Sequence, residues 1–206
     1  MGKDDFEFSP PSDLICSDEE RDLIEAKNSI RLFDKVVDLF EHSNGVLSVT
    51  PDSIAELQRI AMQGILGSAG TWRTRFVDIQ NSNHVPPKHS SVAPLVQEMC
   101  EYATDLQISI HCLHVAGFLL WRLNWIHPFP DGNGRVSRAL CCWAYCVGFE
   151  ISPYETSIFE LIDNDKNSYF ESLRKTDSLV GISEDGIPDM RHMEDFMIGL
   201  HLKSME

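Results

Sequence analysis

One short segment, from 127 to 135, combines side chains that could together transfer a phosphoryl or nucleotidyl group. It reads His-Pro-Phe-Pro-Asp-Gly-Asn-Gly-Arg, and a second arginine, Arg138, follows one helical turn after Arg135. His127 has an ordinary pKa near neutrality, which suits a general base. Asp131 is a carboxylate of the kind that holds Mg²⁺ beside phosphate oxygens. The segment therefore predicts phosphate chemistry assisted by a divalent cation.

The two glycines of this segment, Gly132 and Gly134, predict an anion-binding loop. Without a Cβ, the backbone around Asn133 can turn its N–H groups toward a ligand. An apolar helix is expected to start at the second glycine, and the free N–H groups and dipole at a helix start favour an anion. Arg135 and Arg138 lie one turn apart on that helix, so both guanidinium groups can reach one polyphosphate.

Each of these features also has an ordinary structural explanation. A Gly-Asn-Gly turn between helices is common, the arginines could be surface charges, and the histidine could simply end a helix. Their coincidence within twelve residues, between two apolar helices, favours a site. The segment is not a P-loop, because no Gly-Lys-Ser/Thr follows, and it is not a dinucleotide fingerprint, because no strand precedes it.

The elements that must position this segment are mostly helical. Two strongly apolar helices are expected on either side of it, at about 108–126 and 134–147. Ser17 and Glu20 fit a capping box at the start of a first helix. Helical periodicity predicts the remaining helices at 17–44, from 50 to near 67, and at 91–105, 156–163, 166–176 and 188–204.

One stretch, 71–84, follows a different pattern. It is rich in β-forming residues and contains the turn sequence Asn-Ser-Asn at 81–83, so it predicts a short hairpin. Residues 1–16 are expected to form a flexible tail. The overall expectation is one mostly α domain, 17–206, with a core at about 50–180 and a single hairpin beside the loop.

Composition limits the classes of function. The formal charge is −15, from 17 basic and 32 acidic side chains, so general nucleic-acid binding is not expected. No apolar run approaches the ~20 residues that span a bilayer, so no membrane association is expected. The start of the chain lacks a secretory signal, and the six cysteines show no disulfide or zinc spacing. These observations favour a cytoplasmic protein.

The segment 127–138 resembles the signature of Fic (Fido-fold) proteins, His-x-Phe-x-Asp/Glu-Gly-Asn-Gly-Arg-x-x-Arg, and matches every fixed position. Residues 70–73, the following stretch to Ile79, and residues 84–87 are similar to the hairpin flap of that family and its exit. The resemblance covers roughly 50–180. It implies the helical Fic fold with a small β-hairpin flap beside the active-site loop.

Members of this family bind ATP with Mg²⁺ and usually transfer AMP to a Tyr, Thr or Ser hydroxyl of a target protein. The resemblance implies that His127 deprotonates the hydroxyl, that Phe129 anchors the loop, and that Asp131 holds Mg²⁺. It further implies that Gly132, Asn133 and Gly134 surround the α-phosphate, and that Arg135 and Arg138 hold the outer phosphates. The flap would hold the target segment as an added strand, through Thr74, Arg75, Phe76, Val77, Asp78 and Ile79.

Many family members carry an inhibitory helix, Ser/Thr-x-x-x-Glu-Gly/Asn, whose glutamate pairs with a signature arginine. The nearest sequence here surrounds Glu25, with Arg21 at the Ser/Thr position and Ala26 at the Gly/Asn position. Glu25 is therefore a candidate inhibitory residue, and the alternative is an ordinary exposed acid. Without this motif, the options are constitutive activity, a separate antitoxin-like partner, or control by assembly such as a homodimer.

Three tryptophans border the two apolar helices, at 121, 125 and 143. Core packing is the expectation for them, and an adenine pocket is the alternative. The leading functional hypothesis is a protein adenylyltransferase. The alternatives are a Fido-fold enzyme with another donor or with de-AMPylation activity, and a non-catalytic nucleotide-binding module.

Overall fold

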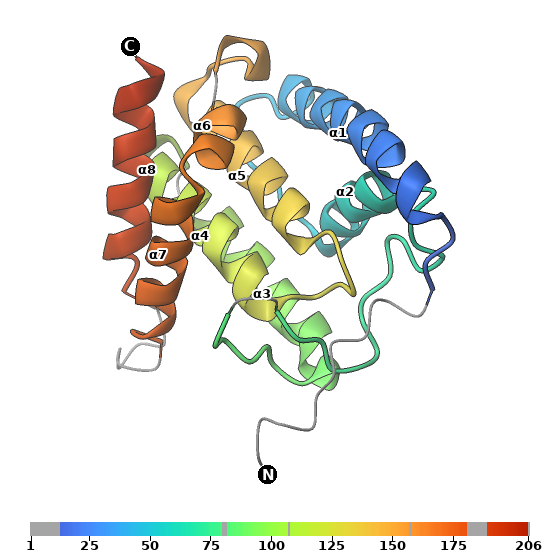
Figure 1. Cartoon of the computed structure of the whole chain (residues 1–206). Helices are drawn as coiled ribbons and strands as arrows, with labels where there is room; N and C mark the ends of the chain where they lie inside the picture. The colour runs from blue at the N-terminus through green and yellow to red at the C-terminus, as the bar shows by residue number, and fades with distance from the viewer. Residues whose placement is uncertain (1–12, 80–81, 107, 157, 181–188, 206) are drawn as a thin grey trace.

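The computed structural model describes residues 13–79, 82–106, 108–156, 158–180 and 189–205, and these residues form an all-helical body (Figure 1). Its centre is the antiparallel pair α4 (Ile108–Ile126) and α5 (Asn133–Phe149), which pack along each other. Both helices are apolar on most sides, so they lie in the core, and the loop between them joins two rigid ends. A non-helical residue, His111, bends α4 near its start.

The other helices cover this pair on three sides (Figure 1). One side is covered by α1 and α2, which also pack on each other; α3 lies against α4, and α6, α7 and α8 cover the remaining side. Their bounds are α1 Asp18–Glu41, α2 Pro51–Met62, α3 Val92–Asp105, α6 Ile158–Asn164, α7 Lys166–Asp177 and α8 Arg191–Ser204. The expected helices are therefore present, with ends shifted by a few residues; the expected start of the last one, Pro188, lies outside the described residues.

The first two helices begin where their sequences provide caps. The Ser17 hydroxyl accepts a hydrogen bond from the Glu20 backbone N–H at 3.3 Å, and the Glu20 carboxylate accepts one from the Ser17 N–H at 3.1 Å. This is the predicted capping box, and it fixes the first turn of α1. Thr50 caps α2 in the same way, with Pro51 as the first helical residue.

The end of the expected flexible tail is ordered. The backbone N–H of Ile15 donates to the Ile65 carbonyl at 3.0 Å, and that of Gly67 donates to the Asp13 carbonyl at 2.9 Å. An isolated antiparallel bridge joins Leu14 to Leu66. Residues 13–16 therefore lie along the segment after α2, which corrects the prediction for that part of the tail; residues 1–12 lie outside the described residues.

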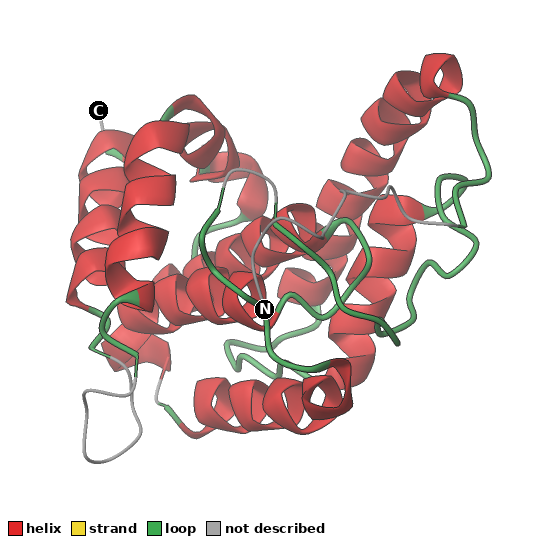
Figure 2. Cartoon of the chain, turned by 60° about the horizontal axis from the view of Figure 1, so that its bottom comes forward, coloured by secondary structure: helices red, strands yellow, loops and turns green. Residues whose placement is uncertain are grey.

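The predicted hairpin at 71–84 is not found in the part of the chain that the structure describes. Residues 71–79 and 82–88 form loops, and residues 80–81, in the expected turn, are not described. Figure 2 shows helices and loops but no strand in the described part of the chain. The backbone of this segment bonds elsewhere: the Arg73 N–H donates to the carbonyl of Pro128, in the loop between α4 and α5, at 2.8 Å. A two-stranded hairpin without a third strand is marginally stable, so such outside contacts are enough to replace it.

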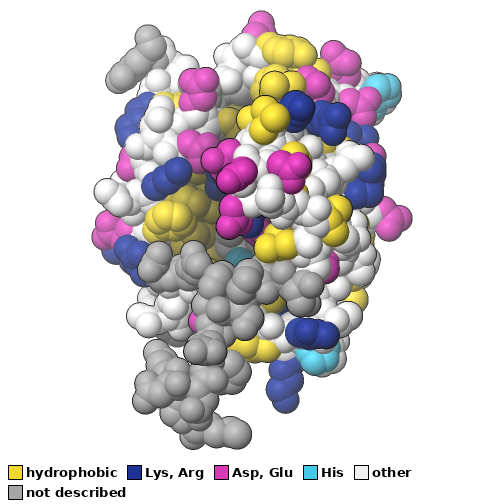
Figure 3. Space-filling view, turned by 45° about the vertical axis from the view of Figure 1, so that its right-hand side comes forward, with side chains coloured by type: hydrophobic (Ala, Val, Ile, Leu, Met, Phe, Trp, Pro, Cys, Tyr) yellow, Lys and Arg dark blue, Asp and Glu magenta, His cyan; other side chains and the backbone are white. Residues whose placement is uncertain are grey.

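Charge is unevenly distributed over the surface. Figure 3 shows a face where several acidic side chains lie close together. The first turn of α1 also carries three consecutive acidic residues, Asp18, Glu19 and Glu20. Among the described residues, no helix is both long enough and apolar enough to cross a membrane.

Candidate active site

The loop between α4 and α5 is fastened to the core by two of its own residues. The Phe129 ring is fully buried and lies 4.7 Å from the Trp72 ring, measured between centroids. The Asn133 side chain accepts a hydrogen bond from the Phe129 N–H at 3.0 Å and donates one to the Phe129 carbonyl at 2.9 Å. The amide of Asn133 is thus engaged within the loop, which leaves its backbone N–H for the expected phosphate contact.

Gly132 is required by the backbone at the start of α5. Its φ is +84°, and a Cβ built there would lie 2.9 Å from side-chain atoms of Met62. As the N-cap residue it offers no side chain, and no side-chain cap hydrogen bond closes this helix start. The first N–H groups of α5 and the positive end of its dipole therefore have no side-chain cap, an arrangement that suits the anion site expected from the sequence.

His127 is held in a left-handed backbone conformation, with φ +49°. Its Nδ1 lies 3.3 Å from the Asn124 carbonyl oxygen. A carbonyl only accepts, so Nδ1 carries the proton and Nε2 keeps its lone pair. Burial lowers the pKa of His127 from 6.5 to about 4, because the charged imidazolium loses its hydration, and the nearby guanidinium of Arg73 acts in the same direction. The imidazole is therefore neutral at physiological pH and able to accept a proton.

Arg73 holds the loop in place and was not singled out by the sequence as functional. Its guanidinium donates to the His127 carbonyl at 2.7 Å, to the Arg75 carbonyl at 3.0 Å, to the Ile126 carbonyl at 3.4 Å, and to the Pro87 carbonyl. The residue is only 3% exposed. One side chain thus joins the entry and exit of the expected flap to the end of α4.

Gln58 on α2 also holds the loop between α4 and α5 in place. Its side-chain amide donates to the Asp131 carbonyl at 3.0 Å and accepts from the Gly70 N–H. Gln58 is fully buried. A polar side chain on the buried face of a helix was the signal that could have identified it.

An ion-pair network from α1 reaches the loop. Arg135 lies 3.4 Å from the carboxylate of Glu25 and 3.9 Å from that of Asp131. Arg21 donates to Glu25 at 2.8 Å and to Asp131 at 2.7 Å. Glu25 therefore contacts the first signature arginine although the surrounding motif departs from the family pattern. Its side chain is one-third exposed, at 33%, so it is not an ordinary exposed acid.

The second signature arginine, Arg138, faces α6. It lies 3.5 Å from the carboxylate of Asp163. Arg135 and Arg138 together line a cavity of about 230 Å³ whose other walls come from α1 and α6, including Phe33 and Phe159. The structure thus brings both arginines to one cavity next to the start of α5.

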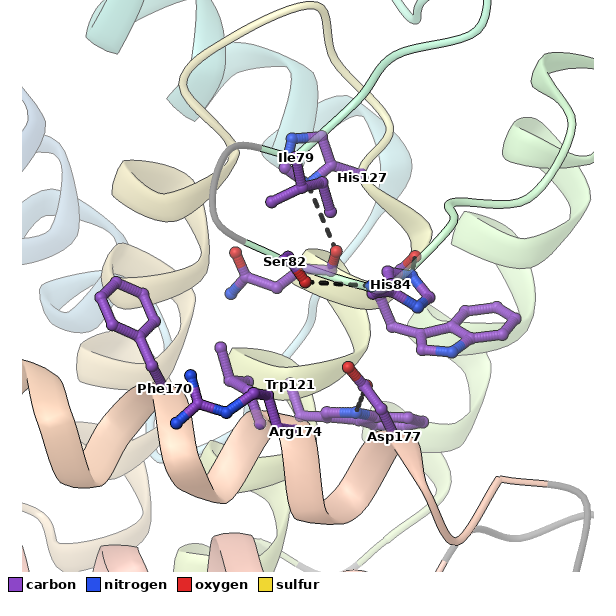
Figure 4. A pocket seen from close by; sticks show the side chains of 11 residues that line it. Ile79, Ser82, His84, Trp121, His127, Phe170, Arg174 and Asp177 are labelled. Carbon is purple, nitrogen blue, oxygen red and sulfur yellow. Dashed lines mark hydrogen bonds between the residues drawn. The ribbon is translucent and has the colours of Figure 1, made fainter. Parts of the chain in front are cut away.

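A larger cavity, of about 340 Å³, has His127 in its lining (Figure 4). In Figure 4, Phe170, Arg174 and Asp177 project from α7 on one side, and Ile79 and His127 face them. Its complete lining is Ile79, Ser82, His84, Trp121, Asn124, Trp125, His127, Phe170, Leu173, Arg174 and Asp177. Trp121 and Trp125 border the cavity as well as packing in the core.

The polar groups of this cavity are held in defined positions. The Asp177 carboxylate accepts a hydrogen bond from the Trp121 indole N–H at 2.8 Å, and burial raises the pKa of that carboxyl. The His84 ring nitrogen Nε2 donates to the Trp125 carbonyl at 2.8 Å. An aromatic and apolar cavity with a few fixed polar groups is typical of a small-molecule site.

Of the expected target-positioning residues, only Ile79 lines this cavity. Val77 is half-buried, and Thr74, Arg75, Phe76 and Asp78 are exposed. Residues 74–79 form the segment that leads from Arg73 to the cavity.

The residues around Asp131 suit a magnesium ion that is shared with a nucleotide. Among the described residues, no group of three or more His, Cys, Asp or Glu side chains could hold a metal alone. Mg²⁺ commonly takes one carboxylate and completes its shell with phosphate oxygens and water. Asp131 is a carboxylate next to the uncapped start of α5, so it suits such a shared ion.

Comparison with known proteins agrees with this geometry. Residues 48–145 match the model of the Fic/DOC family. The chain is 34% identical over 95 residues to a protein named protein adenylyltransferase Fic from Drosophila grimshawi, covering 46% of this chain and 20% of that protein. The corresponding protein of Nematostella vectensis is 33% identical over 100 residues, covering 45% and 22%. The chain thus spans about a fifth of the length of these curated relatives.

Solved structures share the fold. A Fic family protein from Desulfovibrio desulfuricans G20 superposes with a TM-score of 0.72 at 20% identity, covering 89% of this chain and 52% of that one. A fragment of Fic-1 from C. elegans superposes with a TM-score of 0.67 at 18% identity, covering 96% and 52%. The region that matches the family model, residues 48–145, contains the complete signature and the helices α4 and α5 on either side of it, so over this region the chain is similar to the Fic/DOC family.

Proposed function

We propose that this domain is a protein adenylyltransferase, which transfers AMP from ATP to a Tyr, Thr or Ser hydroxyl of a target protein. The observation that carries the proposal is the position of His127. This histidine is kept neutral by burial, lines the larger cavity, and sits in the same loop as the uncapped start of α5. The same loop carries Asp131 and leads to both arginines.

In this reaction the base acts on the incoming hydroxyl. Nε2 of His127 has no hydrogen-bond partner among the described residues and accepts the hydroxyl proton. The oxygen then bonds to the α-phosphorus, while the bond to the bridging oxygen breaks and pyrophosphate leaves. The N–H groups at the start of α5 stabilise the charge that develops on the α-phosphate. Most of the barrier reduction would come from positioning and charge neutralisation.

In the proposed complex, each of the two cavities holds a different part of the nucleotide. The larger one takes the base and ribose, with the Phe170 ring against the base and the remaining Asp177 oxygen accepting from the exocyclic amine. The outer phosphates extend along the start of α5 to Arg135 and Arg138. Mg²⁺, held by Asp131, would neutralise charge on the phosphates when bound.

The arrangement also supports an inhibitory role for Glu25. Its carboxylate lies 3.4 Å from Arg135, and an arginine paired in this way is less available for phosphate. Activation then requires α1 to release Arg135. We therefore expect the wild-type domain to be weakly active and Glu25→Gly to be the active form.

The experiment measures transfer from ATP labelled on the α-phosphate to proteins of a cell lysate. Wild type, Glu25→Gly and the double variant Glu25→Gly/His127→Ala are compared, with Glu19→Gly as the control for a glycine in the same helix. We expect strong labelling only with Glu25→Gly. Equal labelling by the double variant, or none with Glu25→Gly, would contradict the proposal.

A further inference from the structure

We infer that Arg21 is an internal cation that occupies the metal-binding position at Asp131, so that a divalent metal binds there only after Arg21 withdraws. The inference rests on the proposed function, because it concerns the metal that accompanies the nucleotide. It assigns to α1 a second blocking contact, separate from the pairing of Glu25 with Arg135.

Arg21 is in direct contact with the expected metal ligand. Arg21 lies in the first part of α1, 110 positions before Asp131, and its terminal nitrogen is 2.7 Å from Oδ2 of that carboxylate. The other oxygen, Oδ1, accepts from the Gly132 N–H at 2.6 Å. Both oxygens of the expected metal ligand are therefore engaged, one of them by a full positive charge.

A guanidinium and a metal ion compete electrostatically for one carboxylate. A magnesium ion binds carboxylate oxygen at roughly 2.0–2.1 Å and demands a regular octahedral shell. A guanidinium in contact with the same oxygen takes a coordination direction and repels the ion, since both carry positive charge. The Arg21 and Asp131 side chains are only 30% and 31% exposed, so water screens this repulsion incompletely. The Asp131 carboxylate can thus bind either the guanidinium of Arg21 or the metal ion, but not both at once.

Arg21 also orients Glu25. Its Nε donates to Glu25 at 2.8 Å, one helical turn along α1, and the same carboxylate oxygen faces Arg135. Arg21 carries a guanidinium group and stays positively charged at physiological pH. Metal binding at Asp131 thus requires the withdrawal of Arg21, which also removes the contact that orients Glu25 toward Arg135. Metal and nucleotide would therefore both favour the conformation in which the side chains of α1 have withdrawn from the loop.

The test measures how much Mg²⁺ strengthens the binding of ADP, by isothermal titration calorimetry with and without the metal. The ratio of the two dissociation constants isolates the metal contact, because loss of the Glu25 block improves phosphate binding in both conditions. Arg21→Ala and Arg21→Gln are compared with wild type. Arg31→Ala is the matched control, because Arg31 is an exposed arginine of the same helix.

We expect both Arg21 variants to raise the gain from Mg²⁺ by about tenfold, which corresponds to about 1.4 kcal/mol, and Arg31→Ala to leave it unchanged. Thermal unfolding checks that both variants fold; the buried anchors of α1, such as Leu32 and Val36, are untouched by them.

Two results would overturn the inference. An unchanged ratio would show that Arg21 does not compete with the metal. Weaker ADP binding by the variants without metal would show that Arg21 is a resident phosphate ligand instead. If ADP binds to no variant in either condition, the proposed function fails as well, and the two failures are thereby distinguished.

Discussion

Replacement of Arg73 should release the loop between α4 and α5 from the segment that crosses it. The Arg73 guanidinium donates to four carbonyls that belong to three separate pieces of chain, and the residue is 3% exposed. Arg73→Met keeps most of the length of the side chain and removes every donor. The carbonyls of His127 and Ile126 would then lose a charged partner in a buried place.

The expected change in the free energy of unfolding follows from two opposing contributions. A hydrogen bond to a charged group contributes ~1.5–3 kcal/mol, and a buried acceptor left without a partner costs ~1–3 kcal/mol. Against this, burial lowers the pKa of Arg73, which shows that its charge is costly to bury. The net loss of unfolding free energy should be about 3 kcal/mol, well below the sum of four bonds. Arg73→Lys should lose about half as much, because an ammonium retains the charge but not the planar set of donors.

Urea denaturation followed by circular dichroism measures both variants, with Arg75→Met as the control. Arg75 is two positions away and exposed, so its replacement should change the unfolding free energy by less than about 0.5 kcal/mol. A loss below about 1 kcal/mol for Arg73→Met would refute the reasoning, since it would mean that water satisfies the carbonyls equally well.

Three further changes test other parts of the site. The His127 imidazole should titrate near pH 4 by NMR; since its folded pKa lies below 6.5, unfolding free energy should fall as pH drops from 6.5 toward 4, and a midpoint near 6.5 would contradict its burial. Gly132→Ala should lower the unfolding free energy by about 2 kcal/mol, because of the positive φ and the Met62 contact, and a loss below about 0.5 kcal/mol would show that the backbone adjusts freely. Asp177→Ala should weaken ATP binding about tenfold in calorimetry, because it removes the acceptor for the base amine and leaves the Trp121 N–H unpaired; unchanged affinity would place the base elsewhere.

Periodicity and capping were sufficient to predict most helices. The stripe of apolar residues and the Ser17 capping box place α1 correctly, and the two apolar helices around the loop are where the sequence indicates. Local patterns determine such elements because each helix buries one face whatever its neighbours are. The loop between α4 and α5 could be identified as a site because its chemistry lies within one short segment.

Contacts between distant segments could not be read from the sequence. The partner of Arg21 is 110 positions away, and only the packing of α1 and α2 against α5 brings the two together. The hairpin prediction used strand propensity, which depends on having a neighbouring strand, and the described part of this segment instead bonds to the active-site loop through Arg73. Asn133 was expected to reach a phosphate, yet its side chain bonds to Phe129, because the loop folds back on itself.

The most direct test of the account uses ATP labelled in parallel on the α-phosphate and on the γ-phosphate. Each is incubated with Mg²⁺, a cell lysate and the Glu25→Gly variant, with and without His127→Ala. The account predicts that protein acquires only the α-label and that His127→Ala abolishes it. Transfer of the γ-label alone would contradict the account, because it would identify a kinase, and α-labelling that persists without His127 would remove the proposed base.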